Sequence, residues 1–341
     1  MLKRITSVFF LPMLLAGPSL SQANCPVDSS AQTKISFPLK PQEMKNQFPQ
    51  LRSSLPTLSG ISDQQLMAIM ASMGDNFYWA HPKFKDSTEG LLILAHGTNG
   101  PGDNELFEKT KPLSDNYITS IAFGMSMMTS NHISCALLQM RKQGVEKIYV
   151  VPLTESPYNT LFQQWKYAFG LGKKFAYGDI EKIKTEDIQF LEPINDHFYA
   201  REIVYDFAKE ISINPKKELV IVVAHGPIDL EDNKKQLQLM SNIANHVKTQ
   251  GGFYDAIPMS LQDDAAPKIR EENIKKFRKI VEKNSRKGVR VLIVSDLTSS
   301  QGIQTRIKRD LSGLDYSFNE AGLSSHPLFL KWIETSIANA K

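Results

Sequence analysis

The sequence contains one pattern twice: a continuous run of apolar residues that ends in Ala-His-Gly. The first run reads Leu-Leu-Ile-Leu-Ala-His-Gly at residues 91–97, and the second reads Leu-Val-Ile-Val-Val-Ala-His-Gly at residues 219–226. A strand that is buried on both faces of a parallel sheet has such an uninterrupted apolar sequence. His96 and His225 therefore follow buried strands directly, at the edge where open α/β sheets bind ligands.

Each half of the chain continues with a second apolar run, at residues 148–153 in the first half and 289–297 in the second. Segments with helical character separate these runs. Strands that alternate with long helices predict a parallel sheet with helices on both faces. The repetition predicts an α/β protein with two tandem doubly wound parallel-sheet lobes that face a central cleft.

We expect four segments along the chain, at residues 1–23, 24–88, 89–196 and 197–341. The first is a signal peptide, the second is an N-terminal extension, and the last two are the first and second α/β lobes. Prolines punctuate the extension, and one stretch at residues 62–73 has apolar residues at helical spacing. No chemistry is evident in the extension, so we expect it to pack on the surface.

The N-terminus has the features of a secretory signal peptide. Lys3 and Arg4 precede an apolar stretch at residues 8–16 that is too short to span a bilayer, and a small-x-small cleavage pattern ends at Ala23. We expect cleavage after Ala23. The mature protein is then periplasmic or secreted, with no attachment to a membrane.

Composition places the chain among globular proteins, since apolar residues make up 41% and charged residues 22% of the sequence. Without Lys3 and Arg4, 38 basic residues stand against 36 acidic ones, a net charge of +2. This balance argues against a nucleic-acid-binding protein, because such proteins concentrate positive charge. The duplication can close a cleft within one chain, which leaves both a monomer and a homo-oligomer open.

The two cysteines, Cys25 and Cys135, allow two interpretations. Export permits a disulfide between them. Cys135, however, falls in a predicted helix at residues 130–143, where a buried free thiol is the simpler interpretation. Two cysteines are too few for a thiolate zinc site.

Other polar residues also follow the predicted strands. Loops after parallel strands gather on one face of a sheet, so Glu155 and Tyr158 are expected to border the cleft. The simpler interpretation is that Glu155 is an exposed acid and Tyr158 an ordinary turn residue. Asp296 is either a carboxylate at the cleft or a cap for the following helix. His326, which precedes a proline, either begins the last helix or lines the cleft.

Met125, Met127, Met128 and His132 form a further cluster, after an apolar segment at residues 117–123. Thioether and imidazole groups can bind Cu(I) or haem iron in an exported protein. Methionines at a junction between a strand and a helix are more often core residues, and we favour that interpretation.

Several segments, taken in their order and spacing, carry a resemblance to a known family. They are Leu-Ala-His-Gly-Thr at 94–98, Ile148–Pro157, Val-Val-Ala-His-Gly at 222–226, residues 263–267, Val291–Ile303 and residues 322–328. Together they resemble the class II metal chelatases of tetrapyrrole synthesis, the sirohydrochlorin cobaltochelatase (CbiX-type) group. The resemblance covers about residues 90–338.

This resemblance implies a lyase that inserts a divalent metal, Co²⁺ or Fe²⁺, into a tetrapyrrole such as sirohydrochlorin, with loss of two protons. The metal is a substrate, and no organic cofactor is implied. Imidazole suits this chemistry because it binds first-row metals and accepts protons near neutral pH. The implied catalytic residues are His96, His225 and Glu155, with both histidines as metal ligands. The implied ring-binding residues are Thr98, Tyr158, Asp296 and Gln304.

The sequence departs from the family where a second histidine is usual. Thr160 stands at about that place in the first half and Gln304 in the second, and neither is a usual ligand for cobalt or iron. Glu155 is a nearby carboxylate that can replace such a ligand. The departure supports an alternative, a non-catalytic exported protein that binds a tetrapyrrole or a metal. A serine hydrolase is not supported, since the sequence has no Gly-x-Ser-x-Gly motif.

Overall fold

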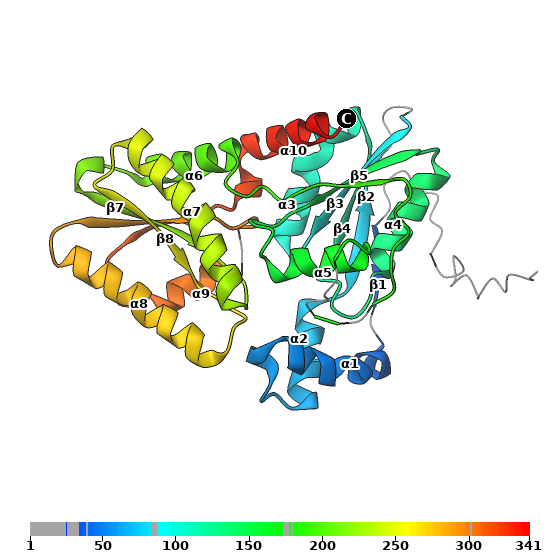
Figure 1. Ribbon diagram of the computed structural model, residues 1–341, viewed down its shortest axis with the longest axis horizontal. Coiled ribbons are helices and arrows are strands. Elements are labelled where there is room, and N and C mark those ends of the chain that lie inside the picture. Colours follow the sequence, from blue (N-terminus) through cyan, green and yellow to red (C-terminus); the bar gives the residue numbers. More distant parts are fainter. Residues whose placement is uncertain are drawn as a thin grey trace, which may run out of the picture.

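The computed structural model describes residues 25, 34–38, 40–82, 87–97, 99–172, 177–178, 180–300 and 302–341. The predicted signal peptide and Thr98 lie outside the described residues. Within those ranges, no helix is both long enough and apolar enough to cross a membrane. The chain forms two α/β lobes that lie side by side (Figure 1).

The first lobe is built on a sheet of six strands. They are β1 (Lys34–Phe37), β2 (Asn76–Ala80), β3 (Glu89–Ala95), β4 (Ile118–Phe123), β5 (Lys147–Pro152) and β6 (Ile188–Phe190). Their order in the sheet is β1-β2-β4-β3-β5-β6. Strands β3 to β6 are parallel, whereas β1 and β2 form an antiparallel edge.

The second lobe is built on a sheet of four parallel strands. They are β7 (Glu218–Ala224), β8 (Asp255–Ser260), β9 (Arg290–Ser295) and β10 (Ser317–Asn319). Their order, β10-β9-β7-β8, is the order of β6-β5-β3-β4 in the first lobe. The equivalent topology confirms the predicted α/β class with two tandem lobes.

The central strands explain why the apolar runs are uninterrupted. Leu91 to Leu94 of β3 and Val220 to Ala224 of β7 have no exposed surface. In the register of the first sheet, Ile93 lies between Ile121 of β4 and Val151 of β5. Neighbouring strands and covering helices therefore bury both faces of these strands, as the sequence predicts.

Helices cover both sheets. In the first lobe they are α3 (Pro101–Thr110), α4 (Asn131–Lys142) and α5 (Thr160–Ala168). In the second lobe they are α6 (Phe198–Ile211), α7 (Leu230–Gly251), α8 (Pro267–Ser285), α9 (Ile303–Asp310) and α10 (Pro327–Asn339). Helix α10 packs on α6 and extends over the first lobe (Figure 1). Side chains of β3, β7, α6 and α10 share one hydrophobic cluster, so a continuous core joins the lobes.

From the sequence we expected the N-terminal extension only to pack on the surface. In the structure it is part of the first sheet. Its strands β1 and β2 enlarge the first sheet, and Phe77 of β2 stacks on Phe123 of β4 with ring centroids 4.6 Å apart. Its helices are α1 (Pro41–Ser54) and α2 (Asp63–Met73), and α2 confirms the helix expected at residues 62–73. Both helices project from the first lobe (Figure 1).

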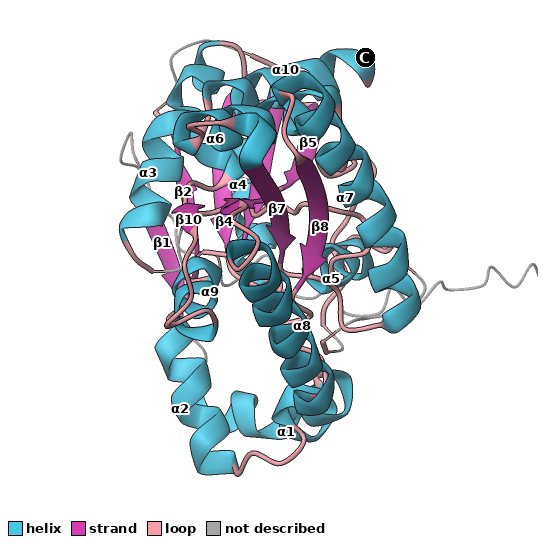
Figure 2. Ribbon diagram, turned by 90° about the vertical axis from the view of Figure 1, so that its left-hand side faces the viewer, coloured by secondary structure: helices cyan, strands magenta, loops and turns pink. Residues whose placement is uncertain are grey.

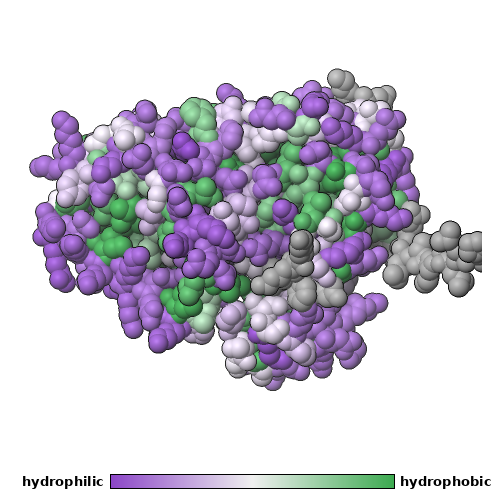
Figure 3. All heavy atoms as spheres, viewed as in Figure 1, coloured by the Kyte–Doolittle hydropathy of each residue, from purple (hydrophilic) through white to green (hydrophobic). Residues whose placement is uncertain are grey.

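A disulfide joins Cys25 to Cys135 of α4, so the paired interpretation of the two cysteines is correct. The bond fastens the beginning of the described chain to the core of the first lobe. The surface that Figure 3 shows is mostly hydrophilic, with hydrophobic side chains in patches over each lobe.

Candidate functional site

Both Ala-His-Gly motifs lie at the topological switch point of their sheets. Strand β3 lies between β4 and β5, and β7 lies between β8 and β9. The connection that leaves β3 runs to β4 on one side and the one that leaves β5 runs to β6 on the other, as do those of β7 and β9 in the second lobe, so a crevice forms at the carboxyl ends. His96 directly follows β3 and His225 directly follows β7, as predicted. In Figure 2 the arrows of β7 and β8 point toward the end of the molecule that carries α1 and α2.

Each of these histidines is oriented by the glycine that follows it. Nδ1 of His96 donates to the carbonyl oxygen of Gly97, and Nδ1 of His225 donates to that of Gly226 at 2.9 Å. Gly97 and Gly226 have φ angles of 76° and 80°, in the left-handed region that glycine adopts at no steric cost. A carbonyl oxygen only accepts, so Nε2 of each ring keeps its lone pair for a metal or a proton.

His225 lies in a cluster of possible metal ligands with Asp263 and Asp264. One ligand atom from each residue lies within 4.8 Å of the other two, and Nε2 of His225 is 3.6 Å from Oδ2 of Asp264. The loops after the adjacent strands β7 and β8 supply these residues. Imidazole suits divalent first-row metals, and carboxylates complete many iron sites, so the cluster is a credible metal site.

Asp263 is held in place by two arginines. Nε of Arg270 donates to Oδ1 at 2.7 Å, and Nη1 of Arg306 donates to Oδ2. Burial opposes the ionisation of Asp263, but the charges of Arg306, His225 and Arg270 outweigh burial and lower the pKa of the carboxyl group. Asp263 is therefore a fixed anion behind the cluster, and Asp264 is the carboxylate that faces His225.

The two imidazoles influence each other across the cleft. Desolvation lowers the pKa of His96, and the charge of His225 lowers it further. The charge of Asp264 raises this pKa but does not outweigh the other two effects. His96 is exposed to solvent, so its desolvation comes from the protein walls around it rather than from direct cover. Burial also favours a low pKa for His225, but the carboxylates of Asp264 and Glu155 outweigh burial and raise that pKa. His96 is thus the neutral base and His225 the more basic ring.

Glu155 and Asp296 form an acidic pair from the two lobes. Glu155, which follows β5, is buried and accepts hydrogen bonds from Nδ2 of Asn159 at 3.0 and 3.1 Å and from Nε2 of Gln236 at 3.3 Å. Asp296 follows β9 and is 2% exposed. Burial, and then the charge of Glu155, raise the pKa of Asp296 well above its usual range, which favours its neutral form. Of this pair, Glu155 is the one whose charge acts on His225, in addition to that of Asp264.

The other predicted ring-binding residues have different surroundings. Thr98 lies outside the described residues. The ring of Tyr158 is half-buried, 5.4 Å from the ammonium group of a lysine on α7. Gln304 is buried, and its Nε2 donates to the carbonyl oxygen of Ser299 at 2.6 Å, so it holds the loop after β9.

Sequence reasoning did not select Asp263, Asp264 or Tyr177 as site residues. The two acids had a usable signal, because they come soon after a strand in the manner of the histidines. Strand β8 is an edge strand that contains Pro258 and is only half-buried, which weakens its apolar pattern.

Tyr177 is a further residue near the cleft. Burial first, and then the charges of Asp264 and Glu155, raise the pKa of Tyr177 well above its usual range. In the described part of the chain, α5 is the regular element that comes before Tyr177, so its place near the cleft has no signal of the strand-end kind.

A hollow of about 70 Å³ lies between the lobes beside His96. The first lobe contributes Asp103 and Lys109 to its walls, and the second lobe contributes Thr298 and Ser299. Nζ of Lys109 also donates to a carbonyl oxygen of the second lobe at 2.7 Å. The volume is enough for a hydrated ion or several water molecules, since a cavity of about 10–15 Å³ already holds one water molecule.

Two further histidines that the sequence singled out have structural surroundings. Nδ1 of His326 accepts a hydrogen bond from the amide of Leu328 at 3.2 Å, so His326 caps α10. His132 of α4 is fully buried, and neither ring nitrogen has a hydrogen-bond partner within the described ranges. Burial lowers its pKa to about 3, so His132 is a neutral core residue at physiological pH.

Comparison with solved structures places the fold among those of metal chelatases. SirB from Bacillus subtilis, in a structure with Fe³⁺, is similar with a TM-score of 0.54 at 18% sequence identity, over 74% of this chain and 95% of SirB. DR2241 from Deinococcus radiodurans, described as a multi-domain protein with structural similarity to chelatases, matches with a TM-score of 0.44 at 13% identity, over 73% of this chain and 54% of that chain. No protein-family model matches the sequence, and neither does any curated protein sequence.

The likeness to SirB shows that this chain has the chelatase fold. The fold that the resemblance implies is therefore confirmed, whereas membership of the chelatase family and of the cobaltochelatase group remains a prediction. At 18% identity the similarity carries the fold alone. The activity depends on the residues of the site itself.

Proposed function

We propose that this protein is a metal chelatase that acts on a tetrapyrrole. The observation that carries the proposal is the pair of Nε2 of His225 and Oδ2 of Asp264, 3.6 Å apart, across the cleft from the imidazole of His96. The substrates are a divalent metal, Co²⁺ or Fe²⁺, and a tetrapyrrole such as sirohydrochlorin. The presence of Fe³⁺ in the SirB structure supports a first-row metal.

The cleft supplies the two things that metal insertion requires. His225 and Asp264 bind the metal, with Asp263 as a fixed negative charge behind them. Insertion releases two pyrrole protons, and the proton acceptors are the free Nε2 of His96 and the buried carboxylate of Glu155. A tetrapyrrole is larger than the hollow of about 70 Å³ beside His96, so that hollow can hold only part of the ring.

Binding without catalysis is a second candidate function with an observation of its own. Gln304 is buried and hydrogen-bonds to a loop carbonyl, and Thr160 is the first residue of α5. The two places where the family has a second histidine therefore offer no usual ligand for cobalt or iron. A carrier for a tetrapyrrole or a metal needs the cleft but not the complete set of ligands.

The test is the absorbance spectrum of sirohydrochlorin with Co²⁺ or Fe²⁺ and the purified mature protein. We expect catalysed conversion to the metallated ring, and we expect His225→Ala and Asp264→Asn to slow it by about 100-fold. His246→Ala is a matched control, because Nε2 of His246 is 2.8 Å from Oε1 of Glu202 in a similar pair between α6 and α7.

The outcomes separate the two functions. A spectral shift that shows ring binding without metallation favours the carrier. Metallation at the same rate in both cleft variants excludes the proposed metal site. If neither the ring nor the metal binds, both functions are wrong.

We also propose that the protein acts outside the cytoplasm. The support is the leader sequence together with the bond between Cys25 and Cys135, because disulfides persist in oxidising compartments. Cell fractionation with sequencing of the mature N-terminus tests this. We expect a chain that begins at Asn24 in the periplasm or the medium, and an uncleaved cytoplasmic chain would contradict the proposal.

A further inference from the structure

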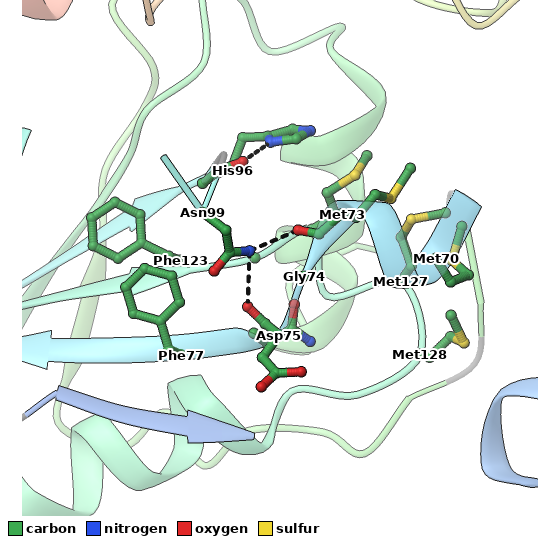
Figure 4. Close-up of a pocket in the computed structure, with 14 residues that line it drawn as sticks. Met70, Met73, Gly74, Asp75, Phe77, His96, Asn99, Phe123, Met127 and Met128 are labelled. Atoms are coloured by element: carbon green, nitrogen blue, oxygen red, sulfur yellow. Dashed lines mark hydrogen bonds between the residues drawn. The ribbon is translucent and has the colours of Figure 1, made fainter. Parts of the chain in front are cut away.

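A pocket on the other side of His96 is lined by methionines from two distant parts of the chain. Helix α2 contributes Met70 and Met73, the loop after β4 contributes Met125, Met127 and Met128, and His96 lies at the rim. Figure 4 shows the sulfur atoms of the labelled methionines gathered on one side of the pocket, with the ring of His96 extending toward them. The chelatase chemistry makes no use of these thioethers.

The sequence groups Met125, Met127 and Met128 with His132, but in the structure a different histidine lies beside them. His132 is buried inside the first lobe and does not line this pocket. His96 lies there instead, and Met70 and Met73 join from the N-terminal extension. An imidazole with a free Nε2 thus faces several thioethers, where the sequence alone favoured a set of core methionines.

The methionine loop is held by two side-chain amide groups. Nε2 of Gln164 on α5 donates to the carbonyl oxygen of Ser126 at 2.8 Å, and Nε2 of Gln47 on α1 donates to that of Met128 at 2.9 Å. Ser126 has a φ of 50°, which is unusual for a residue with a side chain. These bonds hold the loop in a strained turn with Met125 and Met127 on either side of it.

Helix α2 is fastened to the loop that carries His96. Nδ2 of Asn99 donates to the carbonyl oxygen of Met73 at 2.7 Å and lies 3.4 Å from that of Asp75 (Figure 4). The end of α2 and the histidine are therefore positioned by one side chain. The two sources of sulfur and the imidazole are held in place before any ligand arrives, which favours a site over a chance contact.

The size and chemistry of the pocket limit what it can bind. Its volume of about 40 Å³ admits one ion with a few water molecules, since a cavity of about 10–15 Å³ already holds one water molecule. The Asp75 carboxylate points away from the sulfur atoms (Figure 4). Neutral thioethers are soft ligands, which select Cu(I) over the divalent ions that carboxylates bind.

We propose that the pocket between α2 and the loop after β4 is a binding site for one soft monovalent ion of the Cu(I) class. The ligands are the thioethers around the pocket, and the imidazole of His96 at the rim keeps its Nε2 for the cleft. Met73 is 39% exposed and Met125 is half-buried, so they form the mouth through which the ion enters. Met70, Met127 and Met128 are buried and form the floor.

The test is a competition for Cu(I) between the mature protein and a chromogenic Cu(I) chelator under anaerobic conditions. We expect one Cu(I) per chain, and an affinity that falls on the order of tenfold or more when Met73→Leu and Met125→Leu are combined. Methionine and leucine have similar volumes, so this variant removes sulfur with little effect on the fold. The matched control combines Met240→Leu and Met259→Leu, buried positions in the second lobe.

Two results would overturn the proposal: no stoichiometric Cu(I) binding by the wild-type protein, or an equal loss of affinity in the pocket pair and the control pair. X-ray absorption at the copper edge provides a second measurement, in which sulfur neighbours are expected and a shell of only nitrogen and oxygen would contradict the site. His225→Ala should retain Cu(I) affinity, which keeps this test separate from the chelatase test.

Discussion

At the scale of single residues, the two cleft histidines follow equivalent strands but differ in basicity. Asp264 and Glu155 raise the pKa of His225 against the effect of burial, whereas desolvation and the charge of His225 lower that of His96. In an NMR titration of the metal-free protein, we expect His225 to titrate above and His96 below the ordinary value of about 6.5. A metal binds only the neutral imidazole, so divalent-metal affinity should rise as the pH rises through the raised pKa of His225.

The Asp264→Asn variant gives this prediction its control at the same scale. Removal of the nearby carboxylate should lower the titration midpoint of His225 toward about 6.5. Asp206→Asn removes a carboxylate that pairs with a different histidine, 3.3 Å from Nε2 of His326. This variant should leave the titration midpoint of His225 unchanged. A midpoint of His225 below that of His96 in the wild-type protein would show that the assignment of base and ligand is reversed.

At the scale of elements, α2 connects the extension to the methionine pocket, and its first turn depends on Ser62. The Ser62 hydroxyl accepts from the amide of Gln65 at 3.3 Å, and the Gln65 side chain accepts from the amide of Ser62 at 3.0 Å. We expect Ser62→Ala to destabilise α2 by about 1 kcal/mol, or about a fivefold gain in local opening measured by hydrogen exchange. Ser72→Ala is the control in the same helix, since that hydroxyl bonds only to the carbonyl of Ile69 one turn back. Equal exchange in Ser62→Ala and the wild-type protein would contradict the role of the cap.

The elements also show how far the sequence predicts the structure. Strands β3 and β7 are predictable because burial on both faces requires an apolar residue at every position. Strand β1 has only four residues of alternating exposure, which is a short pattern. The buried Met44, Phe48 and Leu51 of α1 have helical spacing, but Pro49 lies among them and weakens the prediction of a helix. The histidines are predictable because they adjoin such strands. The methionine pocket is not predictable from the sequence, because Met73 and Met125 line one pocket only when α2 docks on the first lobe.

At the scale of the whole molecule, the bond between Cys25 and Cys135 spans 110 residues and encloses most of the extension and the first half of the first lobe. A cross-link of this span removes conformations from the unfolded chain. In the loop-entropy model this stabilises the folded protein by about 4–5 kcal/mol, although measured effects are commonly about 2–4 kcal/mol. We expect the variant with Cys25→Ala and Cys135→Ala to lose about 2–4 kcal/mol of unfolding free energy in urea.

Reduction of the wild-type protein separates the effect of the bond from the effect of the substitutions. Dithiothreitol should lower the stability of the wild-type protein toward that of the double variant and leave the variant itself unchanged. The extension also packs through Phe48, Leu51 and Leu66, which are buried in the same hydrophobic cluster as the disulfide-bonded Cys135. If oxidised wild-type protein and double variant unfold at the same urea concentration, these apolar contacts alone hold the extension. The methionine pocket would then keep its Cu(I) affinity in a reducing compartment, because α2 would remain docked without the disulfide.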